Sequence, residues 1–217
     1  ITDLEHNIKY SINEKDEFIA ASIYKLPLAM LYYDKVNEGE YTLDSTFTYS
    51  GYMHEDAGVI SSDYGIGSQV PLSDLLNDLI IYSDNDAGHI LYENLGGWKE
   101  YKEAMTKYTD SISENYYTMD NVTTANTMND VVTYLYDHKE DYKGLIKNME
   151  KAEPGEYLDR DTQLSMPQKY GMYDYALNSV GFVECNTSYS IVVLTSLGDK
   201  GADVMANINR IAYEHFK

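Results

Sequence analysis

Residues 20–30 read Ala-Ala-Ser-Ile-Tyr-Lys-Leu-Pro-Leu-Ala-Met, an apolar run that predicts a helix over residues 21–37. Pro27 falls early in this helix, where the loss of one backbone donor costs little. Ser22 and Lys25 are three residues apart, so a helix places the hydroxyl and the amine on neighbouring positions of one face. A lysine whose amine is neutral can take the proton of a serine nucleophile. The stretch therefore predicts a helix that starts with a candidate nucleophile and its base.

Two further short motifs follow in the chain. Ser83-Asp84-Asn85 comes after an apolar run that predicts a helix over 72–82, and Lys169-Tyr170-Gly171 lies in a β-rich stretch. Ser-x-x-Lys alone arises easily by chance, so the order and context of the three motifs carry the weight. That order resembles the penicillin-recognising serine hydrolases, and most closely the class A β-lactamase family.

The resemblance implies a role for each of three side chains in forming an acyl-enzyme. Ser22 would be the nucleophile, and its backbone N–H lies at a helix start, where unpaired donors can stabilise an oxyanion. Lys25 would accept the proton of Ser22, which requires a lowered pKa that burial and the second cation Lys169 could supply. Ser83 would relay a proton to the leaving nitrogen.

The same resemblance implies the residues that hold the substrate. Asn85 would bind the substrate amide and Lys25, although taken alone it could equally be a helix cap. Lys169 would bind a substrate carboxylate as a point charge. The backbone N–H of Met172, just after Gly171, would be the second oxyanion donor. Where the family usually has Thr or Ser, this chain has Tyr170, whose larger ring moves the hydroxyl outward and is expected to narrow the cleft.

The deacylation base is the weakest part of the resemblance. Class A enzymes use a glutamate in a Glu-x-x-x-Asn pattern on a loop between the second and third motifs, and this interval is short here. Residues 108–117 are the corresponding stretch, followed by Val122-Thr123-Thr124-Ala125. Glu114 is its only glutamate, and Thr118 stands where the asparagine should be. Glu114 is therefore a candidate base, with a solvated loop charge as the alternative.

Composition limits the other classes of function. The formal net charge of −20 argues against binding to nucleic acid or to anionic membrane surfaces. The single cysteine, Cys185, excludes an internal disulfide, and no apolar run is long enough to span a membrane. His54-Glu55 lacks the second histidine of a helical zinc site, and Gly65-Ile66-Gly67 lacks the strand–helix context of a phosphate loop. We expect no metal and no cofactor.

The pattern along the chain predicts an α+β fold. Residues 8–12 and 17–20 read as a hairpin, and further helices are expected at 84–95, 98–107, 126–138 and 141–150. After Pro154-Gly155 the pattern favours strands at 164–170, 175–185 and 189–195, then an amphipathic helix over 202–216. Strands at both ends predict an antiparallel sheet lobe (1–20 plus 155–217) with an inserted helical lobe (21–154). The β-lactamase/transpeptidase-like fold has this architecture.

These observations favour a serine hydrolase that opens β-lactam amides, with a β-lactam or a peptidoglycan stem peptide as partner. Two alternatives stay open: a penicillin-binding D-Ala-D-Ala peptidase-like protein with slow deacylation, and a non-catalytic cell-surface domain that kept the fold. We expect a monomer at the bacterial cell surface or outside the cell, with an export signal or anchor that this sequence lacks.

Overall fold

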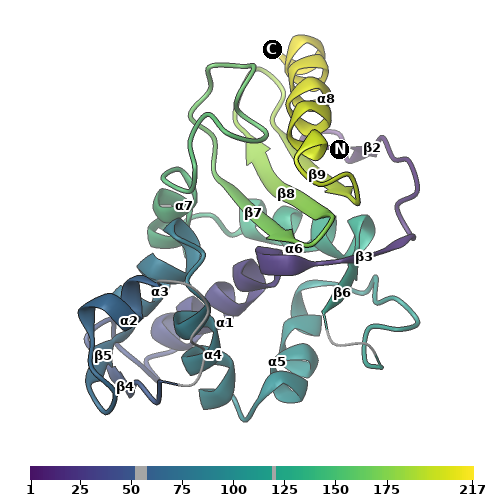
Figure 1. Cartoon of the computed structure of the whole chain (residues 1–217). Coiled ribbons are helices and arrows are strands. Elements are labelled where there is room, and N and C mark those ends of the chain that lie inside the picture. The colour runs from purple at the N-terminus through teal and green to yellow at the C-terminus, as the bar shows by residue number, and fades with distance from the viewer. Residues whose placement is uncertain (52–57, 119–120) are drawn as a thin grey trace.

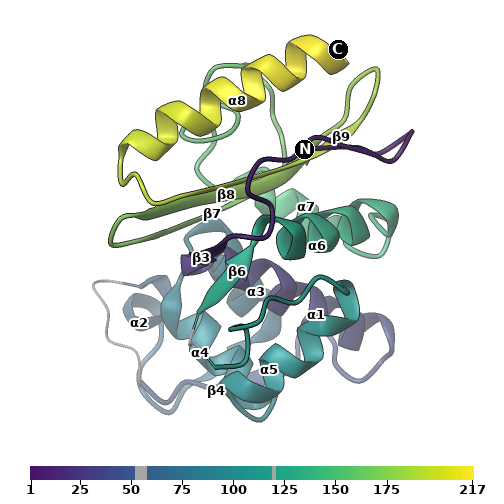
Figure 2. The same ribbon diagram turned by 90° about the vertical axis from the view of Figure 1, so that its right-hand side faces the viewer.

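The computed structural model describes residues 1–51, 58–118 and 121–217. Figures 1 and 2 show three layers: helix α8 (Lys200–Phe216) on one face of a central sheet, the sheet itself, and a group of helices beyond its other face. This is the α+β arrangement expected from strands at both chain ends and helices between them.

The central sheet has five antiparallel strands in the order β2-β1-β9-β8-β7. Their bounds are Thr2–Asp3 for β1, Ile8–Lys9 for β2, Gln168–Tyr173 for β7, Ala176–Val183 for β8 and Tyr189–Thr195 for β9. β7 is therefore an edge strand, and its register places Lys169 opposite Val180 and Gly171 opposite Asn178.

Strand β8 is buried at every position because both faces of the sheet are covered. Helix α8 packs on one face, where Met205 and Phe216 join a core cluster with Leu177 and Ile191. On the other face, Val180 and Phe182 join the larger core of the helical layer. The buried strand β8 thus holds β7 in place through a full register of antiparallel pairs.

Apart from α2, which was not expected, the helices lie close to the ranges predicted from the sequence. Their bounds are Lys25–Asn37 for α1, Val59–Asp63 for α2, Leu72–Ile81 for α3, Asn85–Asn94 for α4, Trp98–Met105 for α5, Ala125–Asp137 for α6 and Lys143–Met149 for α7. Short 3₁₀ helices η1 (Ala21–Tyr24) and η2 (Thr106–Tyr108) precede α1 and follow α5. The helix expected over 21–37 therefore starts with a tighter 3₁₀ turn.

The N-terminal hairpin prediction was wrong. β2 pairs with β1, whereas β3 (Glu17–Ile19) pairs with β6 (Val122–Thr124) to form a separate two-stranded sheet. Local alternation of apolar and polar residues predicts a strand but not its partner, and here the partner is about a hundred residues away in the chain. The strand expected over 164–170 is also displaced, since β7 starts at Gln168.

Two further strands that were not expected, β4 (Thr46–Thr48) and β5 (Gln69–Pro71), form a small antiparallel sheet between α1 and α3 in the chain. Within the described ranges, no helix has both the length and the apolar composition needed to cross a membrane. The division into a sheet lobe and a helical lobe stays an interpretation of this layered arrangement.

Candidate active site

Ser22 lies in η1, where the backbone is held in an unusual conformation. Ala21, the residue before it, has φ of 49°, a region that costs a residue with a Cβ of order 1 kcal/mol or more. The side-chain amide of Asn121 donates to Ala21 O at 3.1 Å, and that of Asn178 donates to Ile19 O at 2.8 Å and Ala20 O at 3.1 Å. These amides hold the backbone that leads into Ser22.

Ser83 occupies the turn between α3 and α4 with φ of 57°. The turn is fixed by Asp84, whose carboxylate accepts from Ala87 N at 2.9 Å and from Ile60 N at 3.1 Å. Asp84 is thus the N-cap of α4. Asn85 is not the cap of this helix, and its side chain extends to Lys25 instead.

The Lys25 amine lies at the centre of the site and is fully buried. Its Nζ is 3.1 Å from Ser22 Oγ, 2.6 Å from Ser83 O and 2.6 Å from Asn85 Oδ1. A backbone carbonyl and an amide oxygen can only accept, so they take two N–H groups of the amine. The remaining tetrahedral position toward Ser22 Oγ suits the lone pair of a neutral amine that accepts the serine proton.

Lys169 reaches the site from β7. Its Nζ donates to Ser83 Oγ at 3.0 Å and to Tyr170 O at 2.9 Å, and the residue is fully buried. Burial, and then the nearby Lys25 amine, hold the pKa of Lys169 well below its usual range, with Glu153 opposing them. Ser83 Oγ is therefore within reach of two amines, since Lys25 Nζ is 3.4 Å away.

Gly171 brings β7 into close contact with the start of η1. A Cβ at this position would lie 2.7 Å from Ser22 N, 2.8 Å from Ile23 N and 3.0 Å from Ala20 O. Only glycine permits this approach of two backbones. The main chain of Gly171 and Met172 thus runs beside the Ser22 N–H, while the Met172 side chain is exposed.

Tyr170 packs beside the Lys169 amine. Its ring stacks on Tyr157 with centroids 4.9 Å apart, and Lys169 Nζ lies 4.1 Å from the ring centroid. Burial raises the pKa of Tyr170 to about 12, so the phenol is neutral near pH 7. The ring is half-buried on the wall of the site.

Glu114 is placed elsewhere. It is exposed and lines a surface groove of about 560 Å³ together with Lys15, Asp16 and Glu17, and its neighbour Asn115 donates to Glu17. Glu17 begins β3, whereas Ser22 follows the other end of that strand. The structure brings Ser22, Lys25, Ser83, Asn85, Lys169 and Gly171 together and does not bring Glu114 to them.

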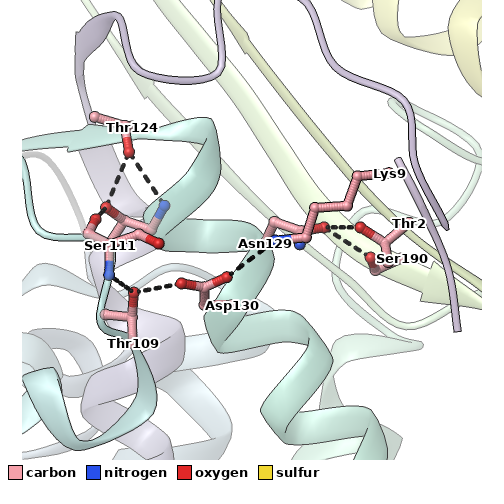
Figure 3. Close-up of polar contacts among 9 residues, drawn as sticks. Thr2, Lys9, Thr109, Ser111, Thr124, Asn129, Asp130 and Ser190 are labelled. Carbon is pink, nitrogen blue, oxygen red and sulfur yellow. Dashed lines mark hydrogen bonds and ion pairs between the residues drawn. The ribbon is translucent and has the colours of Figure 1, made fainter. Parts of the chain in front are cut away.

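A separate polar network, drawn in Figure 3, joins the helical layer to the sheet on the side of α6. Asn129 accepts from Thr2 at 2.9 Å and from Ser190 at 2.8 Å, and the neighbouring Asp130 forms an ion pair with Lys9. None of these residues belongs to the three motifs. The network ties α6 to β1, β9 and β2.

Sequence analysis missed Asn121 and Asn178, which hold the backbone at Ser22. Asn178 carries a recognisable signal, because it is a polar residue within the buried strand Ala176–Val183. Asn121 carries none. Within residues 1–51, 58–118 and 121–217, no cluster of three metal-ligating side chains occurs, and His54-Glu55 falls outside these ranges.

The family model described as the β-lactamase enzyme family matches residues 1–216. Comparison with curated protein sequences finds no match.

Solved structures share the fold over nearly the whole chain. A β-lactamase from Chitinophaga pinensis is 21% identical, with a TM-score of 0.83 and coverage of 100% of this chain and 92% of that one. TLA-3 extended-spectrum β-lactamase is 18% identical, with a TM-score of 0.84 and coverage of 99% and 90%. A variant of PBP-A, solved as an acyl-enzyme complex with penicillin G, is 18% identical, with a TM-score of 0.81 and coverage of 95% and 84%. With three motifs meeting at one site and a family match over essentially its full length, the chain belongs to the β-lactamase enzyme family.

Proposed function

We propose that the protein is a class A-like serine hydrolase that opens β-lactam amides through an acyl-enzyme on Ser22. The observation that carries the proposal is the position of the Lys25 amine, which has two acceptor-only partners at 2.6 Å and Ser22 Oγ at 3.1 Å. This arrangement directs a lone pair at the serine proton when the amine is neutral.

The reaction follows from the contacts. Ser22 Oγ attacks the amide carbon while its proton passes to Lys25 Nζ, and the developing oxyanion is stabilised by the N–H groups of Ser22 and Met172. Lys25 Nζ then passes this proton to Ser83 Oγ, 3.4 Å away, while Ser83 gives its own hydroxyl proton to the leaving nitrogen, so that the C–N bond breaks and the Ser22 ester remains. Lys169, bonded to Ser83 Oγ, attracts the substrate carboxylate.

The fate of the ester is a separate question, and the position of Glu114 bears on it. Because Glu114 is exposed and lines a groove at the other end of β3, it is poorly placed to activate a water at the ester. This observation favours a second candidate, a penicillin-binding, D-Ala-D-Ala peptidase-like protein that deacylates slowly and acts on peptidoglycan stem peptides. Either activity fits a bacterial protein at the cell surface or outside the cell, which we also propose.

Intact-protein mass spectrometry after incubation with benzylpenicillin tests the proposal. The wild-type protein should gain the mass of the penicillin, and Ser22→Ala, which removes only the nucleophilic hydroxyl, should not. No adduct with any penicillin or cephalosporin, and no turnover, would favour the non-catalytic domain of the same fold.

A chromogenic cephalosporin separates the two catalytic candidates. Steady hydrolysis over many turnovers indicates a β-lactamase. A burst of one equivalent followed by slow release indicates a penicillin binder, and the same adduct should then persist for minutes to hours in the mass spectrum.

A further inference from the structure

Two amines share one hydroxyl at this site, and only one distribution of charge between them is productive. Lys25 Nζ, from α1, lies 3.4 Å from Ser83 Oγ, and Lys169 Nζ, from β7, lies 3.0 Å from it. The proposed function, on which this inference rests, requires Lys25 neutral and Lys169 charged. Groups this close titrate as a pair, so the question is which amine keeps the proton after the first is lost.

The surroundings of Lys169 disfavour the protonated form of its amine. Its side chain is fully buried, and burial together with Lys25 holds its pKa well below the usual range. Within the part of the chain that the structure describes, the charged or titratable groups that act on it are Lys25 from α1, Glu153 from the segment before β7, and Tyr170 on its own strand. Glu153 favours the charge, but it is exposed, so water and salt screen its effect.

The ring of Tyr170 stabilises the positive charge of the Lys169 amine and carries no charge itself. Lys169 Nζ lies 4.1 Å from the centroid of the Tyr170 ring, well inside the distance at which a ring face attracts a cation. The contact is sheltered from water, where such attraction is strongest. Tyr157 stacks on the same ring at 4.9 Å and 21°, and this stack restricts its rotation.

We propose that Tyr170 is a positioning residue whose ring face keeps the shared proton on Lys169 and so leaves Lys25 neutral to activate Ser22. The Thr or Ser that the family resemblance implies at this position has no ring and cannot act in this way. Tyr157 has a supporting role, because it holds the ring against the amine.

Three variants test the proposal. Tyr170→Phe keeps the ring face and removes only the hydroxyl, whereas Tyr170→Leu removes the ring and keeps an apolar side chain of moderate size. Tyr157→Leu leaves Tyr170 in place but removes the stack. The titration of Lys169 is followed by NMR on resting protein with ¹³C-labelled lysine side chains, and the signal is assigned with Lys169→Arg. The acylation rate with benzylpenicillin is measured from pH 5 to 10 by rapid quench and mass spectrometry.

Removing a group that stabilises the protonated amine lowers the pKa of Lys169. In Tyr170→Leu we therefore expect Lys169 to titrate at lower pH and the alkaline limb of the acylation profile to move to lower pH. The ratio of molecules that carry the shared proton on Lys169 to molecules that carry it on Lys25 should fall by about tenfold. This change is equivalent to about 1.4 kcal/mol, which is within the range for cation–π contacts. Tyr170→Phe should keep the wild-type titration and limb position, whatever its maximal rate.

The proposal is overturned if Phe and Leu at position 170 give the same Lys169 titration as the wild type. If Tyr170→Leu does not fold, Tyr157→Leu decides: a smaller shift in the same direction supports the proposal, and an unchanged titration contradicts it. The NMR titration needs no substrate. A wild-type protein that reacts with no penicillin would therefore refute the proposed function while still giving a result on Tyr170.

Discussion

Replacing Gly171 by alanine should disable the nucleophile without touching any catalytic side chain. The added Cβ would lie 2.7 Å from Ser22 N, about 0.7 Å short of the 3.4 Å at which ordinary contact begins, and 2.8 Å from Ile23 N. Both neighbours are backbone atoms that cannot rotate away, so β7 and η1 must separate. Overpacking of this kind costs about 1–3 kcal/mol of folding free energy. The displaced atom is also the proposed oxyanion donor, and the loss of such a donor slows reactions by about 10²–10³-fold.

We therefore expect Gly171→Ala to acylate about 100-fold more slowly than the wild type, with a melting temperature a few degrees lower. Stopped-flow kinetics with a chromogenic cephalosporin measures the acylation rate, and thermal unfolding followed by circular dichroism measures the melting temperature. Gly65→Ala is a matched control, since the nearest atom to its Cβ is Ser68 Oγ at 3.9 Å and its backbone does not need glycine. If Gly171→Ala acylates at the wild-type rate, the close approach of β7 to Ser22 does not control reactivity, and the oxyanion assignment is wrong.

Three other changes have defined outcomes. Burial, and then Asp84, raise the pKa of Asp78 to about 7. The folded protein therefore keeps a proton that the unfolded chain releases near the ordinary aspartate pKa of 3.8, and the free energy of unfolding should fall as pH rises from about 4 to 7. Asp78→Asn should remove this dependence and stabilise the protein at pH 8 by on the order of 2 kcal/mol in urea denaturation. Asp34→Ala should cost about 3 kcal/mol because Asp34 accepts from Lys107 and two tyrosine hydroxyls, whereas the exposed Asp44→Ala should change stability by less than about 0.5 kcal/mol. Glu114→Gln should break down its acyl-enzyme within about twofold of the wild-type rate. A slowing of about 100-fold would instead identify Glu114 as the deacylation base.

The parts of the fold that were predictable are those coded by short-range patterns. Apolar residues recurring at helical spacing identified α3 and α6, and the helix expected at 84–95 corresponds to α4. The three motifs also came together, as the resemblance to the class A family implied. Motif order was therefore enough to predict which side chains meet.

The features that could not be predicted from the sequence depend on contacts between segments that are distant in the chain. The partner of β3 is β6, and no local pattern distinguishes it from the expected partner at residues 8–12. The positive φ of Ala21 is likewise imposed from outside, by Asn121 and Asn178. A residue held in such a conformation by distant side chains leaves no trace in helix propensity.

The abundance of tyrosine also becomes understandable from the structure. The chain has 23 tyrosines, and its 36 acidic residues far outnumber its 16 basic ones, so arginine and lysine cannot satisfy every carboxylate. Phenol hydroxyls replace some of the missing cations as donors, since Asp34 accepts from Tyr108 and Tyr142, Asp86 from Tyr49 and Asp74 from Tyr64. Burial, and then the carboxylate partner, raise the pKa of Tyr49, Tyr108 and Tyr142, whereas the hydrogen bond to Asp74, and then burial, raise that of Tyr64. The pKa reaches about 12 for Tyr49 and Tyr64, so these phenols remain donors near pH 7. A phenol is less costly to bury than an ammonium because it carries no charge. Tyrosine therefore lets a strongly acidic chain hydrogen-bond carboxylates next to its core with few cations, and it leaves lysines such as Lys25 and Lys169 for the site.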